Sequence, residues 1–324
     1  MEREDPSIRD LPSAPRPRAH ELPDPQDPRT EWINEITEDT DITSLPTAQL
    51  YELNQNLLDS SISSATPLMA ELAPLTVLRA EYEGGSDSFV KQIDFLISKG
   101  YEGIRRSRGD GDCFYRSLAF AYIERIFNAE DWGIAAAKSI STLEAFLPKL
   151  HEAGFDGMVI DESYEIPRDL IRSIVEPNPG SNNGQTLTPA QLLEVFQNDS
   201  QSNYIVMFMR MLTSAQIRGN PEEYEPFLTH PDLGEQMGVK EFCEAVVEVL
   251  GREADHVQVT AISEALKVNV AIAYFDGRDK DGNVEFVKFN KAIDPSEAPV
   301  TLIYRPGHYD ILDRRSIEAL PFNM

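Results

Sequence analysis

The sequence is poor in cysteine, and this scarcity excludes several classes of protein. Only Cys113 and Cys243 occur among 324 residues, which is too few for a disulfide framework, and no Cys/His cluster has zinc-ligand spacing. No apolar run approaches the roughly 18 residues that a membrane-spanning helix needs. The polar, acidic start at residues 1–6 does not have the pattern of a secretory signal. We therefore expect a reducing compartment, the cytosol or the nucleus, where free thiols persist.

Positive charge is also scarce. The chain carries 29 Lys and Arg against 55 Asp and Glu, a formal net charge of −26. A nucleic-acid-binding protein would present a basic face to phosphates, and an anionic membrane surface would repel this chain. We expect neither kind of partner. The excess of acid suits a basic protein partner instead, because opposite fields speed encounter.

The first 46 residues lack the apolar periodicity of a folded domain. Residues 1–30 hold seven of the 22 prolines, interleaved with charge, and bury too little surface to offset their ordering entropy. Residues 31–46 place acidic side chains around Trp32, Ile33 and Ile36, which fits a solvated tail or a short peptide that docks on a partner. We assign 1–46 to a disordered, acidic, proline-rich tail and 319–324 to a C-terminal tail.

Apolar residues recur with the helical period between Thr47 and Lys267. We predict helices over 47–58, 67–83, 87–99, the segment from Cys113 to 127, 132–152, 158–175, 188–197, 199–218, 239–250 and 257–266. Gly100 and Gly154 are placed to end two of them. Residues 177–185 have the composition of a loop, and 219–238 are rich in proline and acid and are expected to be irregular.

After Lys267 the apolar period shortens towards two. The alternation predicts strands near 268–274, 284–289, 300–304 and 309–313, with Asp-Gly turns at 276–277 and 281–282. Helices followed by a small, mainly antiparallel sheet indicate an α+β fold, with a helical lobe packed on the sheet. We place one catalytic domain at 67–318, preceded by a helical arm at 47–66.

Cys113 follows the turn Asp110-Gly111-Asp112 and precedes a strongly apolar stretch with helical spacing. A thiol at a helix N-terminus faces unpaired backbone N–H groups and the positive end of the helix dipole, which favour the nucleophilic thiolate. The same N–H groups would hold the oxyanion of a tetrahedral intermediate. A buried core thiol is the alternative for an arbitrary cysteine, and it is what we expect for Cys243 within its apolar helical pattern.

Five histidines compete for the role of general base. Four have other expected places: His20 in the tail, His151 near a helix end, His230 in the acidic loop, and His256 at a helix start with a structural hydrogen bond. His308 precedes Asp310 by two residues in an extended segment, so both side chains point to one face. Asp310 can then orient the imidazole and stabilise its protonated form. A His-x-Asp pair on a strand is also typical of a polar surface. Considered together with Cys113, the pair becomes a candidate for catalysis.

Two features beside Cys113 have more than one interpretation. Asp110 and Asp112 are potential metal ligands, but no third or fourth ligand occurs nearby, so we expect no metal and no cofactor. Four arginines form a basic island that either helps to keep the thiol ionised or is simply solvated: Arg105, Arg106, Arg108 and Arg116.

The segments 110–116 (Asp-Gly-Asp-Cys-Phe-Tyr-Arg) and 304–312 (Tyr-Arg-Pro-Gly-His-Tyr-Asp-Ile-Leu) resemble the ovarian-tumour family of cysteine deubiquitinases, in its otubain branch. Segments 239–243 and 254–257 resemble it more weakly, and the similarity runs from about 70 to 313. The resemblance implies a papain-like α+β fold and hydrolysis of the isopeptide bond after the C-terminal glycine of ubiquitin. It implies Cys113 as the nucleophile, His308 as the general base and acid, Asp310 as its orienting partner, and Asp110 as the loop aspartate that shapes the oxyanion hole.

The same resemblance carries expectations about partners. Otubains typically favour ubiquitin chains linked through lysine forty-eight, and a helix before the domain helps to place the proximal ubiquitin. Residues 47–66 occupy that region but match poorly. Some members bind charged ubiquitin-conjugating enzymes and block them without cleavage, so a non-catalytic regulator is the alternative function. We expect ubiquitin and polyubiquitin as partners of a monomeric protein, with conjugating enzymes as further candidates.

Two residues depart from the otubain pattern. Asp112 stands where otubains usually carry asparagine, and a carboxylate beside the thiolate should oppose its ionisation. Gly109 stands in place of the usual proline, which predicts a more mobile loop. Both changes predict an activity below the family norm.

Overall fold

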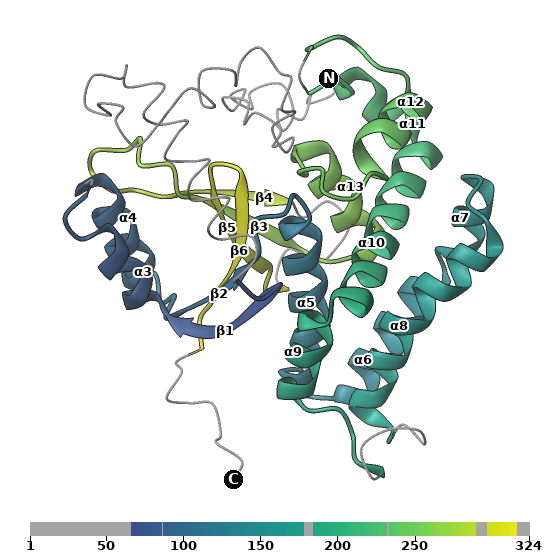
Figure 1. The fold of residues 1–324 in the computed structure, drawn as a ribbon, viewed down its shortest axis with the longest axis horizontal. Helices are drawn as coiled ribbons and strands as arrows, with labels where there is room; N and C mark the ends of the chain where they lie inside the picture. Colours follow the sequence, from purple (N-terminus) through teal and green to yellow (C-terminus); the bar gives the residue numbers. More distant parts are fainter. Residues whose placement is uncertain (1–65, 86, 178–183, 232, 290–296, 316–324) are drawn as a thin grey trace, which may run out of the picture.

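The structure, a computed structural model, describes residues 66–85, 87–177, 184–231, 233–289 and 297–315. A six-stranded sheet stands between a pair of helices and a larger helical group (Figure 1). The predicted tails at 1–46 and 319–324, and the arm at 47–66 except for Thr66, lie outside the described residues. No helix in the described ranges has both the length and the apolar character needed to cross a membrane.

The sheet has the order β1-β2-β6-β5-β3-β4. Its strands are β1 (Met69–Pro74), β2 (Gly103–Ser107), β3 (Val270–Tyr274), β4 (Glu285–Phe289), β5 (Val300–Arg305) and β6 (His308–Asp313). Only β3 and β5 pair in parallel among these neighbours, so the expectation of a mainly antiparallel sheet is confirmed. The last strand, β6, lies inside the sheet between β2 and β5.

The prediction that the sheet comes only from the end of the chain is wrong. Residues 69–74 form β1 rather than the start of a helix, and the helix predicted over 67–83 begins at Leu75. β2 was not predicted either. Strands of five or six residues have weak intrinsic preferences, and here the antiparallel pairing of β1 with β2 and of β2 with β6 overrides local composition. Arg105 made β2 look polar, although it is buried in an ion pair with Glu124.

The helices follow the predicted segments closely in most places. Their bounds are α3 (Leu75–Tyr82), α4 (Asp87–Ser98), α5 (Cys113–Phe127), α6 (Trp132–Glu144), α7 (Leu147–Glu152), α8 (Gly157–Val175), α9 (Pro189–Gln197), α10 (Asp199–Gly219), α11 (Pro221–Tyr224), α12 (Val239–Phe242) and α13 (His256–Leu266). A 3-10 turn, η3 (Glu225–Phe227), and a π-helical segment, η4 (Cys243–Val247), complete them. Gly100 and Gly154 have positive φ angles just after helices, as predicted.

Three predicted segments differ in detail. The helix over 132–152 is two helices, because the chain leaves the helix at Ala145 and restarts at Leu147. The helix over 239–250 changes to the π form at Cys243 and ends at Val247. The irregular segment 219–238 contains α11 and η3. Short helices of this kind depend on tertiary packing more than on propensity, so periodicity alone does not reveal them.

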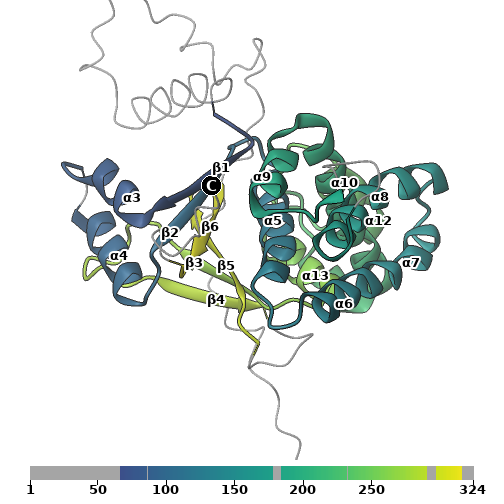
Figure 2. The same cartoon turned by 90° about the horizontal axis from the view of Figure 1, so that it is seen from below.

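Each face of the sheet covers its own apolar core, as Figure 2 shows from below. The larger core lies between one face and helices that include α5, α8, α10 and α13, and the smaller one lies between the other face and α3 and α4. Neighbouring residues of β6 alternate between them: Ile311 belongs to the larger core and Leu312 to the smaller. Thirteen of the 15 residues of α5 are buried, so this helix is the centre of the larger core.

Candidate active site

The turn before α5 fixes where Cys113 begins the helix. Gly111 has a φ of +76°, and a Cβ at this position would lie 1.9 Å from the carbonyl oxygen of Gly251, so only glycine fits. Asp112 is the N-cap residue, but its side chain makes no capping hydrogen bond to the helix. The N–H groups in the first turn of α5 are therefore not occupied by a side-chain cap and remain donors beside the thiol.

The carboxylate of Asp110 shapes this turn from within. Its Oδ1 accepts a hydrogen bond from the backbone N–H of Asp112 at 3.1 Å and one from Nη1 of Arg116 at 2.8 Å. Arg116 is completely buried and also donates to Ser202 at 3.1 Å. Because the N–H of Asp112 already donates to Asp110, it is not free to bind an oxyanion. The expected oxyanion donors are therefore the N–H groups at the start of α5, from Cys113 onwards.

His308 and Asp310 meet on β6 as the two-residue spacing predicts. The short turn at 306–307 joins β5 to β6, and His308 is the first residue of the returning strand. Its Nε2 lies 2.8 Å from Oδ1 of Asp310, which is fully buried. Asp310 also accepts hydrogen bonds from the N–H of Ser107 at 2.9 Å and from Arg305 at 2.5 Å. Hydrogen bonds from Ser107 and Arg305 therefore fix the carboxylate of Asp310, and the carboxylate orients the imidazole of His308.

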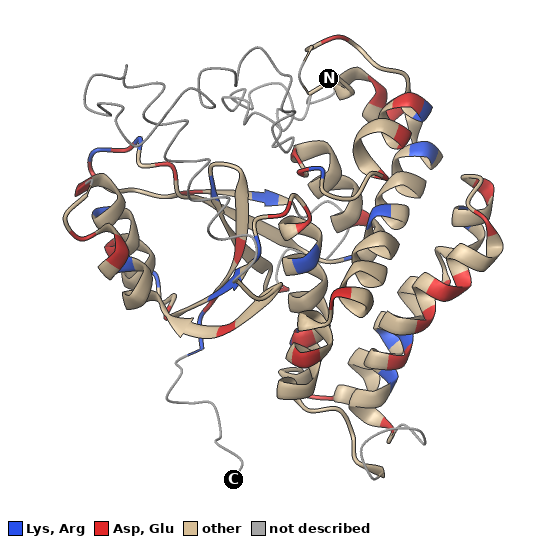
Figure 3. Cartoon of the chain, in the orientation of Figure 1, with Lys and Arg blue, Asp and Glu red and all other residues tan. Residues whose placement is uncertain are grey.

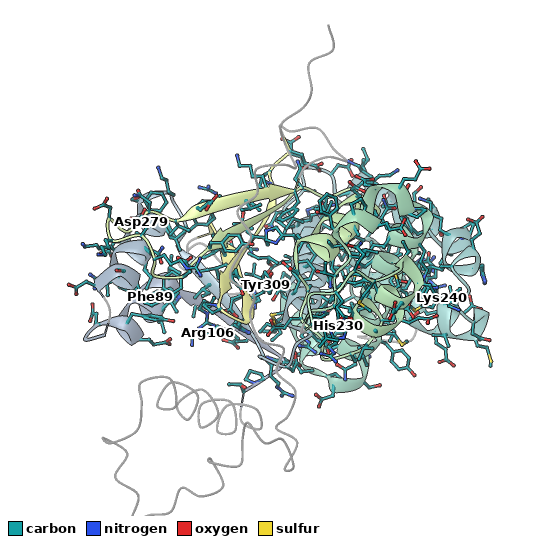
Figure 4. All side chains as sticks on the ribbon, turned by 90° about the horizontal axis from the view of Figure 1, so that it is seen from above. Phe89, Arg106, His230, Lys240, Asp279 and Tyr309 are labelled. Carbon is teal, nitrogen blue, oxygen red and sulfur yellow. The ribbon has the colours of Figure 1, made fainter. Side chains whose placement is uncertain are left out.

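The packing of α5 on β6 brings the two segments of the site together. The rings of Phe114 and Tyr309 are in edge contact at 5.2 Å, and Oγ of Ser117 donates to the carbonyl of Tyr309 at 3.3 Å. Figure 4 shows Tyr309 where the sheet meets the helical group. Since Phe114 follows Cys113 and Tyr309 follows His308, these contacts set the thiol beside the imidazole.

The second ring nitrogen of His308 faces the cysteine loop. Nδ1 is buried and has no partner in hydrogen-bond geometry among the described residues, and a Cβ added to Gly109 would lie 3.5 Å from it. Burial alone would lower the pKa of His308, but the charges of Asp310 and Cys113 and the hydrogen bond with Asp310 raise it to about 10. Nδ1 is thus the ring atom that can exchange a proton with the thiol.

The pKa of Asp310 moves in the opposite direction. Burial would raise it, but the charges of His308 and Arg305, together with hydrogen bonds from His308 and from the N–H of Ser107, hold it below its usual range. An anionic carboxylate behind a protonated imidazole can stabilise a thiolate in front of it. The arrangement is therefore capable of nucleophilic attack with proton transfer.

The residues that were expected to lie outside the site do so. Cys243 is fully buried, with Sγ 3.8 Å from the carbonyl oxygen of Ser214, and burial raises the pKa of its thiol. His256 lies 2.8 Å from Asp255 and 3.1 Å from the hydroxyl of Tyr274, in agreement with a structural hydrogen bond. His151 is on α7 and His230 lies beyond η3, so neither joins the site, and the prediction for His20 falls outside the described residues.

The basic island does not behave as one unit: Arg105 and Arg116 are buried, Arg106 and Arg108 are partly exposed, and each has a partner of its own. Arg105 pairs with Glu124 at 3.1 Å, Arg106 pairs with Glu81 at 2.6 Å, Arg108 donates to the carbonyl of Thr66 at 2.7 Å, and Arg116 pairs with Asp110. Figure 4 places Arg106 towards the side of Phe89 rather than among the helices of the larger core.

Sequence reasoning missed two cations that contact the site. Arg305 binds Asp310, and a signal existed for it, since a tight hairpin at 306–307 places Arg305 opposite His308. Arg210 of α10 binds Asp112 from 98 residues away, and no local spacing signals that contact.

Comparison with known proteins shows which family this chain is similar to. The profile of the family described as Peptidase C65 Otubain matches residues 61–314. The chain is 33% identical over 260 residues to an Arabidopsis thaliana protein named ovarian tumor domain-containing deubiquitinating enzyme 1, covering 77% of this chain and 82% of that one. It is 31% identical over 293 residues to human ubiquitin thioesterase OTUB1, covering 89% and 98%.

Solved structures are also similar to this chain. An h/ceOTUB1–ubiquitin aldehyde–UBCH5B~Ub complex contains a chain that superposes with a TM-score of 0.67 at 30% identity, covering 82% of this chain and 97% of that one. A ceOTUB1–ubiquitin aldehyde–UBC13~Ub complex gives a TM-score of 0.66 at 31% identity, covering 81% and 98%. The expected papain-like α+β fold of the ovarian-tumour family is thereby confirmed.

Proposed function

The chain belongs to the otubain family, peptidase C65, and is a cysteine-type deubiquitinase. We propose the following mechanism for its site and the following substrate. The chain hydrolyses the isopeptide bond after the C-terminal glycine of ubiquitin, with Cys113 as nucleophile, His308 as general acid and base, and Asp310 as the residue that orients His308. One observation carries this assignment: the imidazole has Nε2 on a buried carboxylate at 2.8 Å and Nδ1 towards the thiol.

Acylation begins with attack by the thiolate of Cys113 on the carbonyl carbon of the ubiquitin terminus. The carbonyl π electrons move to oxygen, and the first-turn N–H groups of α5 stabilise the resulting oxyanion. Collapse of this intermediate breaks the C–N bond, and His308 gives its Nδ1 proton to the leaving lysine amine. A thioester between Cys113 and ubiquitin remains.

Deacylation reverses the proton path. Neutral His308 takes one proton from water as the oxygen attacks the thioester carbon. The C–S bond then breaks to release the thiolate and the carboxylic acid of ubiquitin, which loses its remaining proton to solvent. Asp310 keeps Nε2 protonated and stabilises the imidazolium in both half-reactions. Asp110 acts on geometry, because its hydrogen bonds hold the turn that carries Cys113.

The preferred substrate is polyubiquitin linked through lysine forty-eight. The family resemblance supports this preference, and the acidic chain suits a basic binding surface: Figure 3 shows Asp and Glu spread over the helical group, including α8. The test is a panel of di-ubiquitins of all linkages, cleaved by the full chain beside Cys113→Ala. Cleavage of every linkage at one rate would overturn the preference, and equal cleavage by Cys113→Ala would overturn the mechanism.

Binding of charged ubiquitin-conjugating enzymes is a second proposed function. Its support is the similarity to OTUB1 chains solved with UBCH5B~Ub and with UBC13~Ub. Cys113→Ala should still bind a charged conjugating enzyme and slow the discharge of its ubiquitin. A ubiquitin probe with a C-terminal electrophile separates this function from catalysis: rapid adduct formation at Cys113 supports the enzyme, and tight partner binding with no adduct supports a regulator alone.

A monomer in the cytosol or the nucleus completes the proposal. A nucleophilic thiol at Cys113 persists best in a reducing compartment, which is the basis for this location. Cell fractionation and imaging of the tagged full chain test it, and accumulation in an oxidising compartment would contradict it. Light scattering of the purified chain tests the monomer.

A further inference from the structure

The carboxylate of Asp112 has a buried cation as its partner. Arg210 donates to Asp112 Oδ1 from Nε at 3.0 Å and from Nη2 at 2.5 Å. The side chains of Arg210 and Asp112 are only 1% and 9% exposed. The N–H of Gly251 donates to the same oxygen at 3.1 Å. The residue that departs from the otubain pattern is therefore one half of a buried ion pair.

The side chain of Arg210 makes several further contacts that fix its position. It donates to the carbonyl of Val247 at 2.9 Å and to that of Arg252 at 2.6 Å, and its guanidinium lies 4.4 Å from the ring centre of Tyr115. A buried guanidinium with this many partners is held in one orientation, so its N–H groups are not available to bind another anion. The pair thus joins three parts of the chain at the base of the cysteine turn: α10, the loop at 247–252 and Asp112 itself.

The pair matters for the thiol because of where it lies. Asp112 is adjacent to Cys113, and at low dielectric a neighbouring anion disfavours a thiolate strongly. Arg210 brings a positive charge to that carboxylate at hydrogen-bond distance, so the pair as a whole is neutral. The penalty expected from the sequence is thereby offset in the folded chain.

We propose that Arg210 is a positioning and charge-compensating residue: it neutralises Asp112 at the N-terminus of α5 and so keeps the thiol of Cys113 ionisable at neutral pH. The proposal deepens the proposed function, since it concerns the same nucleophile. It assigns Arg210 no contact with the substrate, and its effect passes entirely through Asp112.

Several other groups bear on the same thiol from the elements packed around it. They are His308, Tyr309 and Asp310 of β6, Tyr304 of β5, Asp110 of the turn with its partner Arg116, and Glu253 of the following loop, which lies near Gly307. None of them changes in the comparison that tests the proposal, so a difference between variants reports the pair alone.

The test measures the pH dependence of iodoacetamide alkylation at Cys113 in the full chain, with the modified peptide identified by mass. In Arg210→Gln, Asp112 loses its counter-ion, so the thiol should titrate at least one unit higher and react about tenfold more slowly at pH 7. In Asp112→Asn, Arg210 stays as an uncompensated cation, and the thiol should titrate lower than in the parent chain. Asp112→Asn/Arg210→Gln removes both charges and should return the titration to within about half a unit of the parent.

The opposite signs of the two single variants exclude a merely structural role, which would impair both. Arg210→Lys supports the test if Arg210→Gln does not fold, because it keeps the charge and should titrate like the parent. The proposal is overturned if Asp112→Asn titrates higher, or if the double variant melts like the parent yet stays as unreactive as Arg210→Gln. Alkylation needs no ubiquitin, so failure of the deubiquitination assays and failure of this proposal are distinguishable.

Discussion

The two cysteines are both buried on helices and have different neighbours. Cys113 is the first residue of α5, whereas Cys243 lies within a helix, where α12 continues without a break into η4. Cys113 faces the imidazole of His308, with an anionic carboxylate behind it. Cys243 faces the carbonyl of Ser214 and a guanidinium, Arg218, that Glu248 already binds at 2.6 Å.

This comparison shows that a buried thiol on a helix is not by itself a nucleophile. Burial raises the pKa of Cys243, and the carbonyl beside it cannot accept a proton. Cys113 differs because a strand from the end of the chain brings an imidazole to it, which supplies both a proton acceptor and a stabilising charge.

Replacing the nucleophile gives the largest effect. Cys113→Ala should lower the cleavage of di-ubiquitin by about 10⁴-fold or more, because no other thiol can form the thioester. Binding of ubiquitin should persist, since the change removes a single sulfur atom. Gel assays of cleavage and titration of labelled ubiquitin measure the two properties. Cleavage at the parental rate would show that Cys113 does not carry the reaction.

Neutralising the carboxylate behind His308 comes next. Asp310→Asn should lower kcat by about 10²- to 10⁴-fold, because an amide can hold the wrong imidazole tautomer and no longer stabilises the imidazolium. KM should change little, and the hydrogen bond from the N–H of Ser107 has an acceptor in the variant as well. Steady-state kinetics with a ubiquitin–fluorophore substrate separate kcat from KM. An unchanged kcat would remove Asp310 from the site.

The charge of His308 predicts a pH-dependent stability. Its pKa is about 10 in the folded chain and 6.5 as an ordinary imidazole, so the unfolded state loses the proton first. The stabilisation is complete below pH 6.5 and is lost as the pH rises from 6.5 to about 10. Urea unfolding of the parent and of His308→Gln at several pH values should show their difference narrow across this window. A difference that widens there would contradict the assignment of charge.

The matched control at the other cysteine has the smallest effect. Cys243→Ala should leave kcat/KM unchanged, because this thiol has no imidazole partner, and should lower the free energy of unfolding by about 1 kcal/mol through lost packing. An electrophilic ubiquitin probe should label the parent once, at Cys113, and Cys243→Ala equally well. Loss of labelling in Cys243→Ala would show that the two regions are coupled.

Local rules were sufficient wherever the stabilising partner is close in sequence. The His308–Asp310 pair follows from the alternation of an extended segment, and the helix predicted over 188–197 begins at Pro189 behind a capping box of Thr188 and Gln191. Proline usually interrupts a helix, yet α8 continues through Pro167 to Val175, because packing against the larger core maintains the helix. At this position the burial of apolar side chains of α8 outweighs the local preference of proline to end a helix.

Spacing, turn chemistry and apolar period were enough to predict the proposed nucleophile, its helix, the imidazole–carboxylate pair and the α+β class from the sequence. Only the tertiary structure decided what surrounds them. It added β1 and β2 to the sheet, gave each arginine of the basic island its own partner, and brought Arg210 to Asp112. Coulomb interaction depends on distance in space and on the depth of burial, and neither can be read from positions 98 residues apart along the chain.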